Sequence, residues 1–461
     1  MQTPLPTTSL PQLFTDVACT VCGCVCDDLT LTVENGRIVR AEGACELAEP
    51  WLLAQDARTP ATAEIAGRPA GIEEAVAKSA EILKAAKAPL IYGLSRSSTQ
   101  GQRQAVRLAD ALGANIDTTA SLCHAPSIMA LQQVGESTCS LGEIRNRADL
   151  VIYWGSNPAV SHPRHMERYA ALPTGQFVPE GREGRTLVVV DVQPTATSEQ
   201  ADIFLQVEPG SDFDVLWTLR ALVKGIEPPV DFQISRMGLL SRPNSPRTGR
   251  ESHPTSGQPL AVLRDLAERM KRCQCGVFFF GLGLTQRGVG HANVEALLRL
   301  VRDLNAHTRF HARRMRVYGD VAGADTVLCW QTGFPFSVNL ARGYPRYSPG
   351  EYAANDLLAR GEVDACVLVG SEGVEPLSAA AKEHLTKIPV IVLDYPQEDI
   401  PVLEPPLVPA VKFTTAVYGI HRPGTAYRMD EIPIPLRPVL SSDYPSDDEV
   451  LSAILQAVGR R

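Results

Sequence analysis

The stretch "GIEEAVAKSAEILKAAKAPLIYGLS", residues 71–95, decides the fold class. Its first part places apolar side chains three and four positions apart, which is the period of an amphipathic helix. The following "APLIYGLS" is short and almost wholly apolar, as is typical of a strand buried on both faces. A helix that leads directly into such a strand predicts a parallel sheet covered by helices on both sides.

The same alternation recurs along the chain. Strands are predicted in "ADLVIYWGSNP", "RTLVVVDVQPT", "CGVFFFGLGLTQ", "VDACVLVG" and "IPVIVLDY", and helices in "GQRQAVRLADALG", "SDFDVLWTLRALV" and "GHANVEALLRLVRDLN". We therefore expect doubly wound α/β regions over residues 63–240 and 260–400, with ligands bound beyond the carboxyl ends of the strands.

Two proline-rich segments interrupt this pattern. The stretch "SRPNSPRTGRESHPTSGQP", residues 241–259, is too polar to bury a core and is predicted to be a mobile linker or surface insertion. The tail from "LEPPLVPAV" onward is also rich in proline, and we expect residues 401–461 to wrap the surface in extended form.

Composition limits the classes of partner. The 461 residues carry 44 Lys and Arg against 52 Asp and Glu, a net charge of -8, which argues against nucleic acid or an anionic membrane surface as the main partner. No stretch approaches the roughly 18 apolar residues of a membrane span, and "MQTPLPTTSLPQLF" lacks the features of a secretory signal. We expect a cytoplasmic location, where eleven cysteines indicate metal binding or catalysis before disulfides.

Four of these cysteines lie within "CTVCGCVC", residues 19–26. Cys19, Cys22 and Cys26 are closely spaced, and Cys45 follows later. Three close thiolates and one distant thiolate favour a [4Fe-4S] cluster. A structural zinc ion usually uses two paired hooks, and it remains an alternative together with reduced or redox-sensing thiols. Cys24 is the spare thiol.

The cysteines belong to a small lobe over residues 14–62. Within it, "LTLTVENGRIV" alternates apolar and polar residues around Asn35 and Gly36. This pattern predicts a β-hairpin with a tight turn, so the thiols are expected on a lobe made mostly of strands and turns.

The dipeptide Cys123-His124 lies in "SLCHAPS", in a predicted loop. A buried small thiol beside a satisfied histidine is the more ordinary interpretation. A thiolate in such a loop could also ligate a transition metal while the imidazole moves a proton.

Two further loops follow predicted strands. The segment "GSNPAVSHPRHMERY" holds the candidate cofactor-binding residues Asn157, Pro158, His162, Arg164 and His165, whose positive groups suit an anion such as phosphate. A solvated surface loop is the alternative.

The segment "GLGLTQRGVGHAN" offers Gly281 and Gly283, which would let the backbone approach a phosphate. The full Rossmann fingerprint is not met.

Several long motifs together resemble the B subunit of formylmethanofuran dehydrogenase. They are "ACTVCGCVCDDLTLTVENGRIV", "SLCHAPSIMALQQVG", "GEIRNRADLVIYWGSNPAVSHPRHM", "MRVYGD", "WQTGFPFSVNLARGYPRYSPGEYAANDLL" and "GTAYRMDEIPI". The similarity runs from about Cys19 to the C-terminus, apart from residues 241–259. It implies a molybdopterin-oxidoreductase-like fold with a small iron-sulfur lobe and α/β domains that cradle two pterin guanine dinucleotides.

The resemblance also implies residue roles. The cluster ligands would be Cys19, Cys22, Cys26 and Cys45. Cys123 would bind tungsten or molybdenum, and His124 and Arg316 would be the catalytic proton-transfer and electrostatic groups. Asp191 follows a strand in a loop expected to face the dinucleotide.

The family interconverts CO2 and formate, and formate then passes to methanofuran. The implied partners are an amidohydrolase (the A subunit), the formyltransferase-related C and D subunits, and a subunit whose β-barrel domain closes over the pterins.

Three loops depart from the archaeal pattern: residues 191–193 ("DVQ" in place of Asp-Pro-Arg), "MRVYGD" at 315–320 and "EGV" at 372–374. These departures leave open a second interpretation, the B subunit of a bacterial formyltransferase/hydrolase complex that releases formate without redox chemistry.

Overall fold

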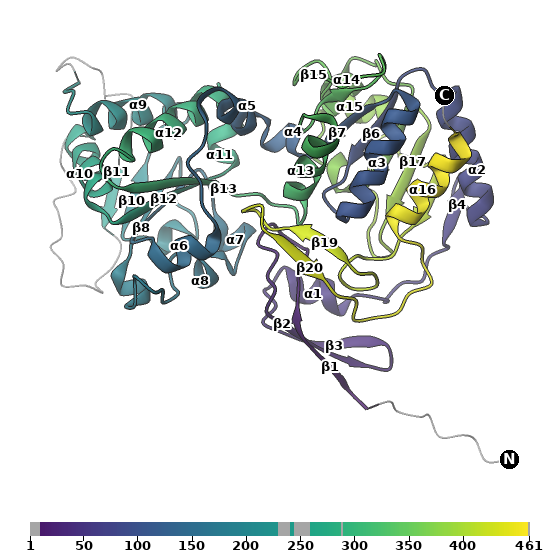
Figure 1. Cartoon of the computed structure of the whole chain (residues 1–461), viewed down its shortest axis with the longest axis horizontal. Coiled ribbons are helices and arrows are strands. Elements are labelled where there is room, and N and C mark those ends of the chain that lie inside the picture. The colour runs from purple at the N-terminus through teal and green to yellow at the C-terminus, as the bar shows by residue number, and fades with distance from the viewer. Residues whose placement is uncertain (1–9, 229–239, 244–258, 287–288, 460–461) are drawn as a thin grey trace. The chain divides into compact units, whose positions relative to one another are not determined.

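The computed structural model describes residues 10–228, 240–243, 259–286 and 289–459. These residues form two compact units, which differ from the division expected along the chain. Unit 1 comprises residues 1–122 and 318–461, and unit 2 comprises residues 123–317. Unit 1 is discontinuous because strands from both halves of the chain pair in one sheet, as Figure 1 allows the reader to follow by colour.

The N-terminal lobe is a three-stranded antiparallel sheet followed by a short helix. Its elements are β1 (Gln12–Val17), β2 (Leu29–Glu34), β3 (Arg37–Glu42) and α1 (Ala48–Leu53). The predicted hairpin is confirmed. Asn35 and Gly36 have φ values of 50° and 75°, and two successive positive φ angles are the requirement of a type I′ turn.

Unit 1 is built on a sheet of nine strands in the order β15-β14-β7-β6-β16-β17-β18-β4-β5. The strands are β4 (Ala63–Ile65), β5 (Arg68–Pro69), β6 (Pro89–Gly93), β7 (Asn115–Thr118), β14 (Val338–Asn339), β15 (Arg346–Tyr347), β16 (Ala365–Val369), β17 (Val390–Asp394) and β18 (Val411–Thr414). The five central strands from β7 to β18 are parallel. The hairpin β19 (Gly424–Tyr427) and β20 (Pro433–Leu436) stands apart.

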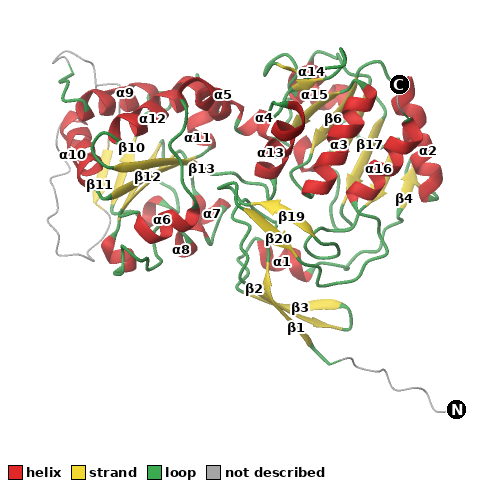
Figure 2. Cartoon of the chain, in the orientation of Figure 1, coloured by secondary structure: helices red, strands yellow, loops and turns green. Residues whose placement is uncertain are grey.

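Helices cover both faces of this sheet (Figure 2). They are α2 (Ile72–Ala85), α3 (Thr99–Leu112), α4 (Ala120–Cys123, which ends at the unit boundary), α13 (Val321–Thr332), α14 (Ala354–Ala359), α15 (Ala379–Leu385) and α16 (Asp447–Val458). Alternate residues of one strand enter different cores: Ile91 packs on the side of α2, α3 and α16, whereas Leu90 and Tyr92 pack on the side of α14 and α15. This explains why the strands are apolar throughout.

Unit 2 contains six strands in the order β11-β10-β9-β8-β12-β13. The strands are β8 (Leu150–Trp154), β9 (Thr186–Asp191), β10 (Ile203–Gln206), β11 (Leu240–Pro243), β12 (Cys275–Phe280) and β13 (Arg309–Arg314). All are parallel except β11, which pairs antiparallel with β10.

The helices of unit 2 are α5 (Ala125–Val134), α6 (Leu141–Arg147), α7 (Pro158–Ser161), α8 (His165–Arg168), α9 (Asp212–Val223), α10 (Pro259–Arg272), α11 (Leu282–Thr285) and α12 (Gly290–Leu304). Helices α9, α10 and α12 cover one face of the sheet, and α6, α7 and α8 lie on the other (Figure 1).

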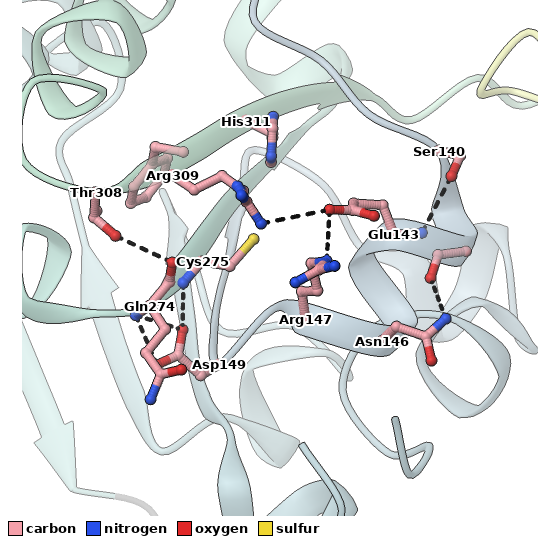
Figure 3. A network of polar contacts seen from close by, with 12 residues as sticks. Ser140, Glu143, Asn146, Arg147, Asp149, Gln274, Cys275, Thr308, Arg309 and His311 are labelled. Atoms are coloured by element: carbon pink, nitrogen blue, oxygen red, sulfur yellow. Dashed lines mark hydrogen bonds and ion pairs between the residues drawn. The ribbon is translucent and has the colours of Figure 1, made fainter. Parts of the chain in front are cut away.

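The amino edge of this sheet is held by a polar network (Figure 3). The Asp149 carboxylate accepts hydrogen bonds from the backbone N–H groups of Gln274 and Cys275 at 2.9–3.1 Å. Nearby, Glu143 pairs with Arg147 at 2.9 Å and with Arg309 at 3.8 Å. These contacts hold the starts of β8 and β12 together, so the role of this edge of the sheet is structural.

The C-terminal segment differs from the expectation of an extended wrap over 401–461. Val411 and Phe413 of β18 are buried within the sheet, and α16 packs Leu451 and Ile454 into the core of unit 1. Ser446 and Glu449 form a capping box at the start of α16, which is a strong local signal for a helix. The prediction was wrong here because prolines before β18 concealed two ordinary elements.

The predicted linker at 241–259 lies largely outside the described residues. Its first residues, 241–243, belong to β11, and its last, Pro259, begins α10. In the parts of the chain that are described, no helix combines the length and apolarity needed to cross a bilayer.

Candidate functional site

The switch point of the unit 2 sheet lies between β8 and β12. The chain adds β9 and β10 on one side of β8 and then returns to add β12 and β13 on the other. Loops that leave adjacent strands in opposite directions open a crevice at the carboxyl ends, where ligands of doubly wound folds bind. The two loops predicted to bind a cofactor follow β8 and β12, so the structure brings Asn157 and Pro158 to the same edge as Gly281 and Gly283.

The glycines of these loops allow close backbone packing. Gly155 has a φ of 55°, and a Cβ added to it would lie 2.7 Å from the Leu284 nitrogen. A Cβ on Gly281 or Gly283 would lie 2.7 Å from Ser156 or Gly155. From sequence, Gly281 and Gly283 were expected to let the backbone approach a phosphate. The structure adds that a side chain at either position would collide with the loop after β8.

The histidines after β8 are interior groups. His162 and His165 are 1% and 0% exposed. Burial lowers the pKa of His162 to about 4 and lowers the pKa of His165 well below its usual range, where the nearby His162 adds to the effect. Both imidazoles are therefore neutral near pH 7, so any positive charge that this loop offers to an anion comes from its arginines, and the assignment of His162 and His165 as cofactor-binding residues stays a prediction.

The remaining candidates around this loop have specific partners. The Asn157 side chain accepts hydrogen bonds from the Thr197 hydroxyl at 2.7 Å and its N–H at 3.2 Å. Arg164 pairs with Glu167 at 3.1 Å. Asp191 ends β9 and accepts a hydrogen bond from the Val192 N–H at 2.7 Å. An acidic residue at the end of the second strand is the position that binds a ribose in dinucleotide folds.

His124 and Arg316 lie close together in unit 2, as the resemblance implied. Both are almost completely buried. Burial is the largest cause that lowers the pKa of His124 well below its usual range, followed by the charges of Arg316 and Arg314, while a hydrogen bond to the Met315 carbonyl acts in the opposite direction. A neutral imidazole beside a buried guanidinium can accept a proton from an anion that the guanidinium holds.

Two neighbours of these groups are held by specific contacts. Arg314 pairs with the buried Glu136 at 3.2 Å. His124 lies at the start of α5, and the Ser127 hydroxyl of that helix donates to the His124 carbonyl at 2.9 Å. The arrangement therefore offers a buried guanidinium and a neutral base in the same part of the unit.

Cys123 is the last residue of α4, directly before His124. Its side chain is half-buried, and its carbonyl accepts a hydrogen bond from the Thr285 hydroxyl at 3.2 Å. Thr285 follows the glycines after β12, so Cys123 is tied to the switch-point loop of unit 2. The role of Cys123 as a metal ligand, which the resemblance implies, stays a prediction.

The ionisation of two of the lobe cysteines depends on the thiols around them. Burial raises the pKa of Cys19 well above its usual range, and the neighbouring thiols of Cys22, Cys26 and Cys45 raise it further. Burial likewise raises the pKa of the half-buried Cys45, with additional contributions from Cys22 and Cys26. Thiols that destabilise one another's ionised form gain most from a cationic group between them.

Backbone N–H groups are directed at two of these sulfurs. The N–H groups of Leu47 and Ala48 lower the pKa of Cys45 against the effect of burial, and the N–H of Val21 does the same for the pKa of Cys19. Hydrogen bonds to cysteine sulfur are one means by which proteins stabilise and tune iron-sulfur clusters. The donor set therefore fits a [4Fe-4S] cluster.

The cysteine loop is fixed against the rest of unit 1. Cys22 forms a bridge with Tyr318, and the Met429 N–H donates to the Gly23 carbonyl at 2.8 Å. Gly319 admits no side chain because an added Cβ would overlap the Thr20 carbonyl. Val25 has a φ of 37°, which is rare for a β-branched residue. This strain is stored in the turn that leads into Cys26.

No group of three or more His, Cys, Asp or Glu side chains in the described ranges is arranged to hold a single metal ion. The four thiols are thus related by charge and by shared backbone contacts, and their assignment to a cluster remains a prediction.

The sequence analysis missed a second switch point, in unit 1. The parallel strands run in the order β7-β6-β16-β17-β18, so the reversal lies between β6 and β16. Arg96 follows β6 and pairs with Glu398 at 2.6 Å, while Glu372 after β16 lies 4.0 Å from Arg96. Burial raises the pKa of Glu372 to about 7. Its carboxylate oxygens have no hydrogen-bond partner among the described residues.

Position at a strand end was the signal that could have identified these groups. Arg96, Glu372 and Asp394 all follow or end buried strands. They lack a recognisable motif, and their meeting depends on the sheet order. The same is true of Thr197, which reaches Asn157 from the loop after β9.

Comparisons with known proteins identify relatives of this chain. The B subunit of the tungsten-containing formylmethanofuran dehydrogenase 2 of Methanocaldococcus jannaschii is 38% identical over 97% of this chain and 99% of its own length. The B subunit of the formyltransferase/hydrolase complex of Methylorubrum extorquens is 27% identical over 67% of this chain and 74% of its own. Formate dehydrogenase H of Escherichia coli is 29% identical over 61% of this chain and 43% of its own. No family model matches the sequence.

Two solved structures share the fold. A chain of the Methylorubrum extorquens formyltransferase/hydrolase complex with methylofuran superposes with a TM-score of 0.64 at 22% identity, covering 85% of this chain and 97% of that one. Acetylene hydratase from Pelobacter acetylenicus gives a TM-score of 0.64 at 13% identity, covering 96% and 69%.

Two doubly wound sheets with a small antiparallel cysteine lobe define the molybdopterin-oxidoreductase fold class, as the sequence analysis predicted. The similarity over nearly the whole of both chains is more specific. This chain belongs to the family of formylmethanofuran dehydrogenase B subunits, whose members are parts of enzyme complexes, and its relatives among the formate dehydrogenases and nitrate reductases imply a metal-pterin cofactor.

Proposed function

We propose that the chain is the redox subunit of a formylmethanofuran dehydrogenase-like complex and interconverts CO2 and formate at a metal-pterin centre. The observation that carries the proposal is the meeting of His124 and Arg316 in the interior of unit 2, with Cys123 next to His124 in the chain. These residue types are those that a thiolate-ligated metal, a proton acceptor and a carboxylate-binding group require.

The reaction is HCOO⁻ ⇌ CO2 + H⁺ + 2e⁻. The metal-pterin group, when bound, supplies the two-electron chemistry. The Arg316 guanidinium would hold the carboxylate oxygens, and the neutral His124 would accept the proton from carbon. Because its pKa lies well below the usual range, the protonated imidazole would release that proton readily in the direction of CO2 reduction.

The cofactor assignments follow the same residues. Cys19, Cys22, Cys26 and Cys45 would hold a [4Fe-4S] cluster that passes single electrons. Cys123 would ligate tungsten or molybdenum. The loops after β8 and β12, together with Asp191, would contact a pterin guanine dinucleotide, since glycine-dependent loops at a switch point are the dinucleotide site of this fold class.

Partner subunits are part of the proposal. The relatives are the B subunits of multi-subunit complexes. An amidohydrolase, the A subunit, would condense formate with a methanofuran-type carrier. The formyltransferase-related C and D subunits would accompany it, and a β-barrel subunit would cover the pterins. A cytoplasmic location would suit the reduced thiols.

A redox-inactive role is the second candidate. Under it the chain would be a structural subunit of a formyltransferase/hydrolase complex that releases formate from formyl-methanofuran. One observation favours it: the Methylorubrum relative is similar over 67% of this chain. The loop "DVQ" at 191–193 also departs from the Asp-Pro-Arg pattern that the resemblance implies for archaeal members. The complete set of lobe cysteines favours the first candidate.

Metal content and one substitution separate the two candidates. The purified complex should contain iron together with tungsten or molybdenum, and Cys123→Ala should abolish CO2/formate exchange while the cluster absorbance remains. Cys329→Ala, which changes an exposed thiol on α13, is the matched control and should keep full activity. Iron without tungsten or molybdenum supports the structural role. Zinc as the sole metal contradicts the assignment of an iron-sulfur cluster under either candidate function.

A further inference from the structure

Three strand-end loops of unit 2 are joined by hydrogen bonds that end on the residue proposed to hold formate. Thr197, after β9, bonds to Asn157 at 2.7 Å and accepts a hydrogen bond from the Ala159 N–H at 3.1 Å. Asn157 and Ala159 begin the α7 segment, whose last residue is followed by His162. The His162 Nε2 lies 2.6 Å from the carbonyl oxygen of Arg316.

The tautomer of His162 follows from its partners. A carbonyl oxygen can only accept, so Nε2 must carry the proton. The buried ring is neutral because its pKa is lowered to about 4, so Nδ1 must be an acceptor. The Ser161 hydroxyl lies 2.8 Å from Nδ1 and 3.1 Å from the Asn157 carbonyl oxygen, so its single proton is shared between these two acceptors. His162 is therefore held in one orientation with its N–H aimed at the main chain of Arg316.

A second imidazole acts on the preceding residue. A hydrogen bond joins His124 to the Met315 carbonyl, and the Met315 N–H donates to the Phe280 carbonyl at 2.9 Å. Consecutive carbonyls just beyond β13 are thus each bound by a buried histidine. The backbone that carries the Arg316 side chain has little freedom to rotate while both bonds are intact.

We propose that His162 is a positioning residue for Arg316: it couples the loop after β8 to the main chain beyond β13 and so sets the direction of the guanidinium. This inference rests on the proposed function, because the anion held by Arg316 is formate. It assigns His162 a different role from direct contact with a phosphate, which its burial and neutral charge disfavour.

The test compares three variants of the full chain in its complex. His162→Leu removes the donor and approximately keeps the volume, whereas His162→Gln keeps an N–H at the position of Nε2. His384→Leu is the matched control, since His384 also places Nε2 at 2.8 Å from a backbone carbonyl, that of Val363, but does so in unit 1.

The first readout is affinity for azide, an anion with the charge of formate and the linear shape of CO2. Loss of one buried hydrogen bond that orients the binding group should weaken azide binding about tenfold in His162→Leu. His162→Gln should remain within about threefold of the wild type, and the control should be unchanged. The KM for formate should rise in parallel while kcat changes less, as expected when ground-state binding is lost.

The second readout does not depend on the metal. Hydrogen exchange of the peptide that covers residues 312–318 should become faster in His162→Leu, slow again in His162→Gln and stay at the wild-type rate in His384→Leu. Wild-type exchange in His162→Leu would overturn the proposal, as would wild-type azide affinity in a metal-loaded complex. Absence of tungsten and molybdenum from the wild-type complex would instead refute the proposed function, and the exchange measurement would still decide the role of His162.

Discussion

The switch points of the two units follow the same rule of topology and carry opposite chemistry. In unit 1 the reversal between β6 and β16 gathers carboxylates, with Glu372 and Asp394 buried near Arg96. In unit 2 the reversal between β8 and β12 is flanked by the neutral imidazoles of His162 and His165. The same topology thus places buried carboxyl groups at one switch point and buried neutral imidazoles near the other.

The contrast extends through the interiors. Burial raises the pKa of five acids in unit 1, namely Asp117, Asp320, Glu372, Asp394 and Asp447. Burial lowers the pKa of four histidines in unit 2, namely His124, His162, His165 and His311. The buried carboxyls of unit 1 should therefore cost it stability as pH rises, although the lowered pKa of His421 in the same unit acts in the opposite direction. The buried histidines of unit 2 should cost that unit stability as pH falls.

The largest expected effect is at a glycine that the unit 2 switch point needs. Gly155→Ala should cost about 4 kcal/mol of unfolding free energy, from the positive φ and from overlap with the loop after β12. Gly225→Ala is the matched control, because its φ of 71° is also positive but no atom lies within 4 Å of the added Cβ. It should cost about 1 kcal/mol. Urea denaturation measures both, and equal costs would show that the close approach is unimportant.

Glu372→Gln should weaken the pH response of unit 1. The folded pKa of about 7 exceeds the ordinary 4.5, so the folded state binds the proton more tightly, and the wild type should lose about 2 to 3 kcal/mol between pH 5 and pH 8 on this account. The variant should lack this loss and be the more stable form at pH 8.

Denaturation at the two pH values measures the effect of Glu372→Gln. Glu74→Gln, an exposed glutamate on α2, makes the same change of charge without burial and should leave the pH slope as it is. If Glu372→Gln also leaves the dependence of the unfolding free energy on pH unchanged, this carboxylate is not the cause of that dependence.

His162→Gln should have the opposite effect on unit 2. The folded pKa of about 4 lies below the ordinary 6.5, so the unfolded state binds the proton more tightly. The wild type should then lose about 2 kcal/mol between pH 7 and pH 5. The variant should lose correspondingly less. Hydrogen exchange of core peptides from each unit separates the acid sensitivity due to His162 from the effect of Glu372. Acid sensitivity confined to unit 1 peptides would contradict the predicted difference between the two units.

The smallest effects are expected from the serines that support each edge. The Ser371 hydroxyl donates to the Asp394 carboxylate in unit 1, and the Ser161 hydroxyl lies 2.8 Å from His162 Nδ1 in unit 2. Each change to alanine should cost about 1 kcal/mol near neutral pH. The cost of Ser371→Ala should become smaller as pH falls, because burial raises the pKa of the Asp394 carboxyl and a neutral carboxyl is a weaker acceptor than a carboxylate. The cost of Ser161→Ala should persist at pH 8. Thermal unfolding against pH provides the comparison.

Much of the fold was accessible from sequence because its signals are local. Apolar strands such as Pro89–Gly93, the Asn35-Gly36 turn and the alternation with helices indicated the α/β class and the hairpin. The C-terminal elements escaped because β18 has only four residues and follows a run of prolines. The discontinuous unit 1 could not be foreseen from spacing, because β16 pairs with β6 from the other half of the chain.

The candidate site divides in the same way. Cys123, His124, Arg316 and the lobe cysteines could be proposed from sequence because each lies in a motif that resembles the family. Their surroundings were not. The sequence placed His162 in a loop suited to an anion, and the fold buries it and turns its N–H toward the Arg316 carbonyl. Glu372 and Arg96 carry no motif and became a pair through the order of the strands.

The sequence alone determined which chemistry this protein could perform: thiols at cluster spacing, a Cys-His pair and the strand-end loops. Only the tertiary structure decided which groups are charged, because charge in an interior depends on desolvation and on neighbours distant in the chain. Burial makes imidazoles neutral at one switch point and favours protonated carboxyls at the other. The opposite character of these two similar edges is a property of the folded molecule.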